Sequence, residues 1–493
     1  QRQRLEEVRR KETATEGSLL AEHLLQKWSW GEMSAQDIQA IADLAVQDSE
    51  QKRDLTKLKE LGAAGLHGKY ANKVYQAVYK TGAQGIRLPT PFLVKVPFKN
   101  PWGMMLQAVM LPHVLFSSIY ASYRATWEKS ICPNLDALER FWNVMVESKN
   151  PNITPAMTRK KNWKRRLIPL ALHGDGVPIT GLGKSWVQTV TNFAWYSLLT
   201  MSTSTADSLF FVYAMVDKMR VDAKDLTGHS SMVFGRQLTT WVESILAEFL
   251  VTCADPYDAS SIEGQKAGKP LAAGYCAVLF SLVGDLDYYA TILDVARSTS
   301  VTAPCSRCRA TKYGDMSWQD FRPAANWMSS AYSPAGWKAL PAADKSTCPL
   351  FHMPWTSICN LGYDYMHCKY LGVDRISMFF RAQKKSLSLR GKAAENRSLA
   401  RPLLAIWAAR MTAGIAVHRK LHLLLKLNWR LEELLEVNKF EFAFAEADAN
   451  AFRDAMTGFL LLQKELSQHF SDHDPKLFNY TEKSHFLQHL GLE

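Results

Sequence analysis

Two acidic residues follow short apolar runs in the same way. The run at 167–172 leads into Asp175 and the run at 277–283 leads into Asp285, with a Gly directly before each Asp. An acid just past a strand is fixed by the sheet and still faces solvent. Two such acids on neighbouring strands, with a third acid nearby, can hold paired Mg²⁺ ions for phosphoryl transfer. Alternatively, both are turn formers, because Asp-Gly is a common turn dipeptide; Asp287 also competes with Asp285 as the second acid.

A second group of residues has metal-ligand spacing. Cys305 and Cys308 form a CxxC pair that can reach one Zn²⁺, but a tetrahedral structural site needs two more ligands. His485 and His489 face the same way if residues 485–489 are helical, and they would complete a Cys2His2 site. Other residues compete for the same role, namely Cys348, His352, His367 and Cys368. Alternatively, the two histidines belong to an ordinary amphipathic helix.

Two further patterns carry weaker signals. Asp364 and His367 lie one helical turn apart, which suits metal binding, orientation of an imidazole or a plain surface pair. Lys184 follows Gly183 in a Gly-rich stretch that lacks phosphate-loop spacing, so we expect a flexible loop whose lysine lies near Asp175.

A basic run surrounds one Trp just before the first apolar strand. It predicts either a phosphate-contacting patch with an aromatic that stacks on a base, or a solvated loop. Its members are Arg159, Lys160, Lys161, Trp163, Lys164, Arg165 and Arg166.

Composition describes a globular chain that prefers polyanionic partners. Its 493 residues are 47% hydrophobic and 22% charged, with a formal charge of +12, which excludes a disordered tail, a fibre and a disulfide-knotted module. Eight Cys are too sparse for a disulfide scaffold and fit a reducing compartment. We find no signal-peptide pattern, and the apolar stretches 102–121 and 193–216 are interrupted by polar residues. Buried helices are therefore expected there, not membrane spans.

These residues must be positioned by a mixed, helix-rich α/β fold. Strands are expected at the two apolar runs, and helices at about 186–218, at about 235–252 and across most of 370–470. The expected organisation is a helical N-terminal region (1–90), a Pro-punctuated linker with an apolar helical segment (91–165), a first core part (166–300), an insertion (301–480) and a return to the core (481–493).

Taken in order, the motifs resemble the catalytic region of CACTA-type DNA transposases. That family shows an Asp-Gly motif, a second Asp followed by CxxC, a DxMH motif, and a late H-x3-H-Leu-x-x-Glu. The matching residues here are Asp175, Asp285, Cys305, Cys308, Asp364, His367, His485, His489 and Glu493. The matches span 167–493, whereas the first 165 residues match nothing we can place. The Asp-Gly motif continues as Val177-Pro178, which departs from the family's usual Asn-Pro-Phe type.

The resemblance implies an RNase H-like core split by a large, mostly helical insertion. It implies that Asp175, Asp285 and Glu493 form a DDE triad holding Mg²⁺ or Mn²⁺, and that the Cys2His2 set holds Zn²⁺. The metals would activate water to nick DNA, and then the freed 3′-hydroxyl to attack target DNA. DNA is the expected partner, the nucleus the expected location, and a homo-oligomer an open alternative; no role for Asp364 and His367 follows.

Two other functions compete with an active transposase. Because the sequence starts without Met and stops at Glu493, we expect a fragment or a decayed member of the family. A domesticated relative would bind DNA or act as a scaffold without catalysis. A helical interaction protein with one structural zinc is the third alternative.

Overall fold

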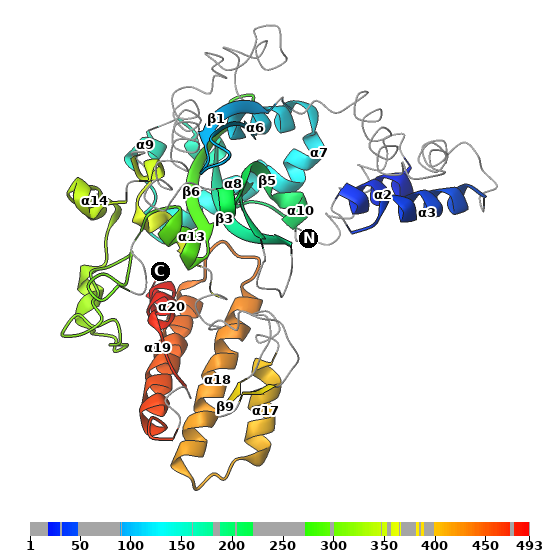
Figure 1. Ribbon diagram of the computed structural model, residues 1–493. Helices are drawn as coiled ribbons and strands as arrows, with labels where there is room; N and C mark the ends of the chain where they lie inside the picture. Colours follow the sequence, from blue (N-terminus) through cyan, green and yellow to red (C-terminus); the bar gives the residue numbers. More distant parts are fainter. Residues whose placement is uncertain are drawn as a thin grey trace.

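The computed structural model describes most, but not all, of the chain (Figure 1). The described residues are 18–29, 32–47, 89, 91–159, 161–180, 188–202, 205–219, 272–295, 300–346, 348–352, 356–363, 365, 381–383, 386–388, 399–473 and 478–492. The expected helix at about 235–252 lies outside them.

A five-stranded mixed sheet forms the centre of the protein. Its order is β5-β4-β3-β6-β7. β3 pairs with β4 and β4 with β5 in antiparallel fashion, whereas β6 runs parallel to β3 and β7 parallel to β6. The strands are β3 (Leu167–Thr180), β4 (Gln188–Ser197), β5 (Phe210–Val216), β6 (Cys276–Gly284) and β7 (Leu361–Tyr363).

Burial explains why the central strands are continuous apolar runs. From Leu167 to Leu172, β3 is buried at every position, as is β6 from Cys276 to Phe280, because strands with parallel neighbours are covered on both faces. The helix α8 (Leu135–Glu147) packs on them through its apolar stripe, and Asn134 caps its first turn. The indole N–H of its Trp142 donates to the carbonyl of Leu167 at 2.6 Å, which fixes the helix to the start of β3.

Helices and a hairpin precede the sheet in the sequence. The hairpin consists of β1 (Phe92–Pro97) and β2 (Met104–Val109). It is followed by α6 (Pro112–Ser122), α7 (Arg124–Thr126) and the π-helix η1 (Trp127–Ile131), which pack into the main core. Before it, α2 (Leu19–Ser29) and α3 (Ala35–Gln47) share a small apolar core of their own.

A helical bundle follows the sheet and projects from it (Figure 1). Apolar stripes on α18 and α19 face each other, and α20 packs on α19 at the end of the bundle nearest the sheet. The bundle helices are α17 (Ala400–Arg410), α18 (Ala416–Val437), α19 (Glu446–His469) and α20 (Glu482–Leu492).

Short elements complete the described structure. They are α9 (Pro155–Thr158), η2 (Trp163–Arg165), α10 (Thr205–Ser208), η3 (Asp217–Met219), α13 (Leu286–Thr291), η4 (Asn326–Ser330), α14 (Pro334–Lys338), η5 (Ala342–Asp344), η6 (Pro349–His352), η7 (Ile358–Asn360), β8 (Arg381–Gln383) and β9 (Ser386–Ser388).

The mixed α/β class is confirmed, but several expectations about elements were wrong or incomplete. The helix expected at about 186–218 is replaced by β4, α10 and β5, because its β-branched and aromatic residues form strands in which β4 pairs with β3 and β5 pairs with β4. The expected linker after residue 91 contains the β1–β2 hairpin, and β2 replaces the first part of the buried helix expected at 102–121. The expected insertion at 301–480 contributes β7 to the sheet. The bundle agrees with the helices expected across 370–470 from residue 400 onward, whereas the described residues before it form the strands β8 and β9. Among the described helices, none has the length and apolarity to cross a membrane.

Candidate metal centre and acidic sheet edge

The four residues of the predicted Cys2His2 set meet in one buried cluster. Cys305 Sγ lies 3.4 Å from His489 Nε2, and Cys308 Sγ lies 3.3 Å from His485 Nε2. The four ligand atoms all lie within 4.8 Å of one another. Two thiols and two imidazoles with this compactness suit tetrahedral Zn²⁺, which is bound by S and N at about 2.0–2.3 Å. The prediction that these four residues come together is confirmed, and the cluster that they form could hold a metal ion.

Local structure explains how residues so distant in sequence come together. The two histidines are four residues apart on α20, so both point from one face of that helix. The two cysteines lie in the irregular segment after α13, where the backbone N–H of Arg307 donates to Cys305 Sγ at 3.3 Å. A metal here would tie this segment to the C-terminal helix.

Protonation in the cluster is strongly perturbed. Burial alone would raise the pKa of the Cys305 thiol, but the hydrogen bond with Cys308 and the two neighbouring imidazoles hold that pKa well below its ordinary value. The hydrogen bond to Cys305 and burial raise the pKa of Cys308. Burial lowers the pKa of His485. Neutral imidazole and thiolate are the forms that ligate zinc, so the shifts favour the ligating forms of Cys305 and His485, whereas Cys308 has to lose its proton when a metal binds.

Aromatic packing encloses the cluster. The Trp327 ring lies edge-on to His485 at 4.3 Å between centroids and at 5.0 Å from His489. On α20, the Gln488 amide donates to the carbonyl of Phe321 at 3.2 Å. Of the competing ligands, Cys348 is buried outside the four-residue group. The side chains of His352, His367 and Cys368 lie outside the described residues.

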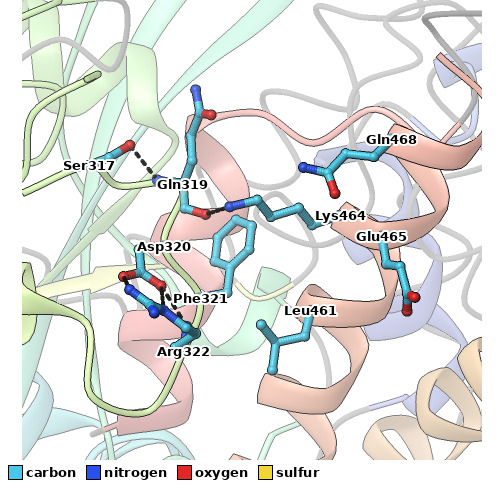
Figure 2. A pocket seen from close by; sticks show the side chains of 9 residues that line it. All are labelled: Ser317, Gln319, Asp320, Phe321, Arg322, Leu461, Lys464, Glu465 and Gln468. Atoms are coloured by element: carbon cyan, nitrogen blue, oxygen red, sulfur yellow. Dashed lines mark hydrogen bonds and ion pairs between the residues drawn. The ribbon is translucent and has the colours of Figure 1, made fainter. Parts of the chain in front are cut away.

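A groove of about 410 Å³ lies between the segment from Ser317 to Arg322 and the helix α19 (Figure 2). Its wall is held by Lys464 of α19, whose Nζ donates to the carbonyl of Gln319 at 2.7 Å. Arg322 and Asp320 pair with each other at its rim. Charges of both signs line it, so it favours no charged ligand. The hydrogen bond between Lys464 and Gln319 ties the cysteine-bearing segment to the bundle.

The two predicted acids follow a registered pair of glycines. Gly174 on β3 and Gly284 on β6 are partners in the parallel ladder, so Asp175 and Asp285 come next on neighbouring strands. Adjacent strands lie roughly 4.8 Å apart. Tyr363 of β7 continues the same row, and Asp364 is the next residue in the sequence, although it lies outside the described residues. Both acids therefore belong to one edge of the parallel part of the sheet.

The environments of the two acids differ. Asp175 is exposed and lies within β3, not past its end, because antiparallel pairing with β4 continues to Thr180. Asp285 follows β6 as expected and is half-buried. It is also the N-cap of α13, since its Oδ1 accepts the backbone N–H of Tyr288 at 2.6 Å. The turn-former interpretation is thus partly right for Asp285. One carboxylate oxygen remains outside this cap.

Lys160, Lys184, Asp364, His367 and Glu493 lie outside the described residues, as does the side chain of Asp287. The described part of the chain therefore contains two of the three acids proposed for the triad.

The basic run lies at the other end of β3 from Asp175. Arg166 precedes the strand and Asp175 is nine residues later, which corresponds to about 30 Å of extended chain. Trp163 is half-buried and packs edge-on to Trp142 at 5.0 Å. Lys164 donates to Asn143 at 2.7 Å. The exposed members are Arg159, Lys161, Arg165 and Arg166.

No known family model matches the sequence, and no curated protein matches it significantly. What the site can do therefore follows from its own geometry.

Two residues were missed by sequence analysis. The buried ring of Tyr288 covers both glycines of the registered pair: a Cβ at Gly174 would lie 2.0 Å from its Cε2, and one at Gly284 would lie 2.3 Å from its Cδ1. The Gly before each Asp was the available signal. On α18, Glu432 is only 3% exposed, and its Oε1 accepts the Tyr365 hydroxyl at 3.0 Å. Its charged neighbours in the sequence, Arg430 and Glu433, give no sign of this burial.

Proposed function

We propose that the chain carries the core of a metal-dependent DNA-cleaving enzyme of the RNase H-like, transposase-related class. The observation that carries the proposal is the position of Asp175 and Asp285, each directly after one member of the Gly174–Gly284 pair on neighbouring strands. Acids in adjacent strands at one sheet edge can share divalent ions.

The sheet supports the RNase H-like part of the proposal. In sequence order, its first three strands form an antiparallel meander, and its last two add on the other side, parallel to the first. This is the order and direction expected of an RNase H-like sheet, with the first acid on the central first strand and the second after the fourth.

The described acids suit hard oxygen-liganded cations. Asp175 is exposed, and Asp285 keeps one oxygen outside its helix cap. Bound Mg²⁺ or Mn²⁺ would supply an activated water and neutralise charge on the scissile phosphate. The chain's own contribution is positional: β3 is held between β4 and β6, and the Asp285 backbone is fixed by the start of α13. By resemblance, Glu493 is the proposed third acid.

The Cys2His2 cluster supports the relation to CACTA-type transposases. Its first pair follows the second acid in sequence, and its second pair precedes the candidate third acid. A zinc ion bound there would hold the end of α20 close to the core, where that third acid is needed.

The test is a plasmid-nicking assay with Mg²⁺ or Mn²⁺. Asp175→Asn should lower the nicking rate by at least about a hundredfold, since it removes a proposed metal ligand from the site. Asp315→Asn, at an exposed loop acid, is the matched control and should leave nicking unchanged. Nicking that persists in Asp175→Asn would refute the triad. A wild-type chain that binds DNA and zinc but never nicks would favour the non-catalytic scaffold.

A further inference from the structure

The β1–β2 hairpin contacts β5, and its tip lies at the same end of the sheet as the acids. The backbone N–H of Met110 donates to the carbonyl of Val212 at 2.8 Å, and that of Lys99 donates to the carbonyl of Met219 at 3.1 Å. The hairpin tip at 99–103 is therefore fixed next to the residues that follow β5.

Strand register gives the separation of this tip from Asp175. Asp175 pairs with Asn192 on β4, and Asn192 pairs with Ala214 on β5, so Ala214 lies roughly 10 Å from Asp175. Lys218 follows four residues later in η3, which places it within about 20 Å of Asp175. That distance corresponds to about six base pairs of DNA at roughly 3.4 Å each.

The tip and the nearby Lys218 carry exposed positive charge, with Asp217 next to Lys218 in the sequence. Lys95, Lys99 and Lys218 are exposed, and none forms an ion pair with another described residue. The sequence between residues 61 and 127 contains no Asp or Glu at all. Over the same stretch it contains seven cationic residues, namely Lys69, Lys73, Lys80, Arg87, Lys95, Lys99 and Arg124. A chain segment of this composition attracts polyanions.

Exposed apolar side chains lie beside these lysines. The Trp102 backbone N–H donates to the carbonyl of Lys99 at 3.0 Å, and the Trp102 residue is 43% exposed. Met104 and Leu106 on β2 are 62% and 58% exposed. Cations next to an exposed aromatic match proteins that hold the phosphate backbone and stack on, or wedge between, bases. Trp163 of the basic run, by contrast, is engaged by Trp142.

We propose that the hairpin tip, with Lys99 and Trp102, and Lys218 together form a DNA-binding surface that holds duplex DNA beside the acidic edge. This inference rests on the proposed function for the identity of its partner. The lysines contact phosphates, and Trp102 contacts the bases or sugars next to them.

Binding is tested without nicking, by fluorescence anisotropy in the absence of added divalent metal. The probe is a labelled duplex of about 30 base pairs, long enough to span the tip and Asp175. The double variant Lys99→Gln/Lys218→Gln should bind about tenfold more weakly. Its slope of log affinity against log salt should fall by about 2, because two phosphate contacts are lost. Trp102→Ala should weaken binding several-fold with little change in that slope.

The matched control is Lys149→Gln/Lys426→Gln, which removes the same charge from two other exposed lysines. Equal losses in the test and control pairs would refute the surface. Unchanged DNA binding with lost binding to phosphatidylserine vesicles would also refute it, in favour of a membrane. If the wild-type chain does not nick DNA but the lysine variants still lose affinity, the proposed function fails and this inference stands. If Asp175→Asn loses nicking while the lysine variants keep their affinity, the proposed function stands and this inference fails.

Discussion

Gly174 on β3 and Gly284 on β6 are registered partners, and one buried ring, that of Tyr288, occupies the space where both would carry a Cβ atom. The ring belongs to α13, the helix that Asp285 caps. The two Gly-Asp pairs therefore have a structural reason as well as a proposed catalytic one. Only glycine leaves room for the Tyr288 ring, and that ring packs α13 against β3 and β6 next to both acids.

Gly174→Ala should destabilise the fold. Its Cβ would lie 2.0 Å from the Tyr288 ring, and overpacking of this kind costs about 1–3 kcal/mol of unfolding free energy. Gly176→Ala is the control, because its Cβ meets only a Thr189 methyl group at 3.1 Å. Chemical denaturation measures both. Adding Tyr288→Leu to Gly174→Ala should recover part of the loss, and equal destabilisation by the two single variants would contradict the contact.

Cys305→Ser should abolish zinc binding. We expect about one zinc per chain in wild-type protein and nearly none in the variant, measured by elemental analysis, together with a lower melting temperature, since structural zinc stabilises the folded state directly. Cys359→Ser is the control: this buried thiol donates to the Tyr332 carbonyl at 3.1 Å, a bond that serine can replace. Undiminished zinc in Cys305→Ser would rule the cluster out as a metal site.

The candidate site was predictable where short motifs fix geometry. Four-residue spacing on a helix is enough to align His485 with His489, and the CxxC pair needs only a turn. The contact between the two pairs depends on the tertiary fold. Cys305 is 184 residues from His489 in the sequence, and no local pattern predicts that they meet. The family resemblance suggested that the two pairs form one site, and the structure shows their four side chains buried together.

The sheet was predictable only at its buried centre. The apolar runs in β3 and β6 are recognisable because parallel strands are covered on both faces. β4 and β5 alternate less clearly, and their Trp195 and Tyr213 suit a helix as well as a strand. Pairing of β4 with β3 and of β5 with β4 decides between helix and strand, and pairing partners are not encoded locally. For the same reason Trp163 looked free to stack on a base, although it packs against Trp142.

Stability should fall on acidification because of His113. This imidazole, on α6, is buried, and burial lowers its pKa to about 4. The folded state thus keeps it neutral while the unfolded state protonates near its ordinary pKa of about 6.5. The contribution of neutral His113 to the free energy of unfolding is fully present above about pH 6.5. It is lost progressively as the pH falls to about 4, by about 3 kcal/mol in total. Denaturation across that range should show a flatter pH dependence for His113→Gln, and identical profiles would contradict the assignment.

Trp163→Ala should affect stability and not DNA affinity. Its ring packs on the buried Trp142, so truncation removes an aromatic pair and part of the cover over the start of β3, at a cost of about 1–3 kcal/mol. Thermal unfolding and the anisotropy assay measure the two effects separately. Arg166→Gln, at an exposed position of the same run, serves as the comparison for charge. A large loss of DNA affinity in Trp163→Ala with an unchanged melting temperature would restore the base-stacking interpretation.

Asp285 needs two substitutions, because its carboxylate has two candidate roles. Asn caps a helix about as well as Asp does, so Asp285→Asn should keep the bond to the Tyr288 N–H and the stability of α13. Asp285→Ala should lose the cap and about 0.5–2 kcal/mol of unfolding free energy. If the carboxylate is a metal ligand, both variants lose nicking, since neither offers the charge that Mg²⁺ prefers. Full nicking in Asp285→Asn, with a destabilised Asp285→Ala, would reduce this residue to a helix cap and leave Asp287 as the acid to test.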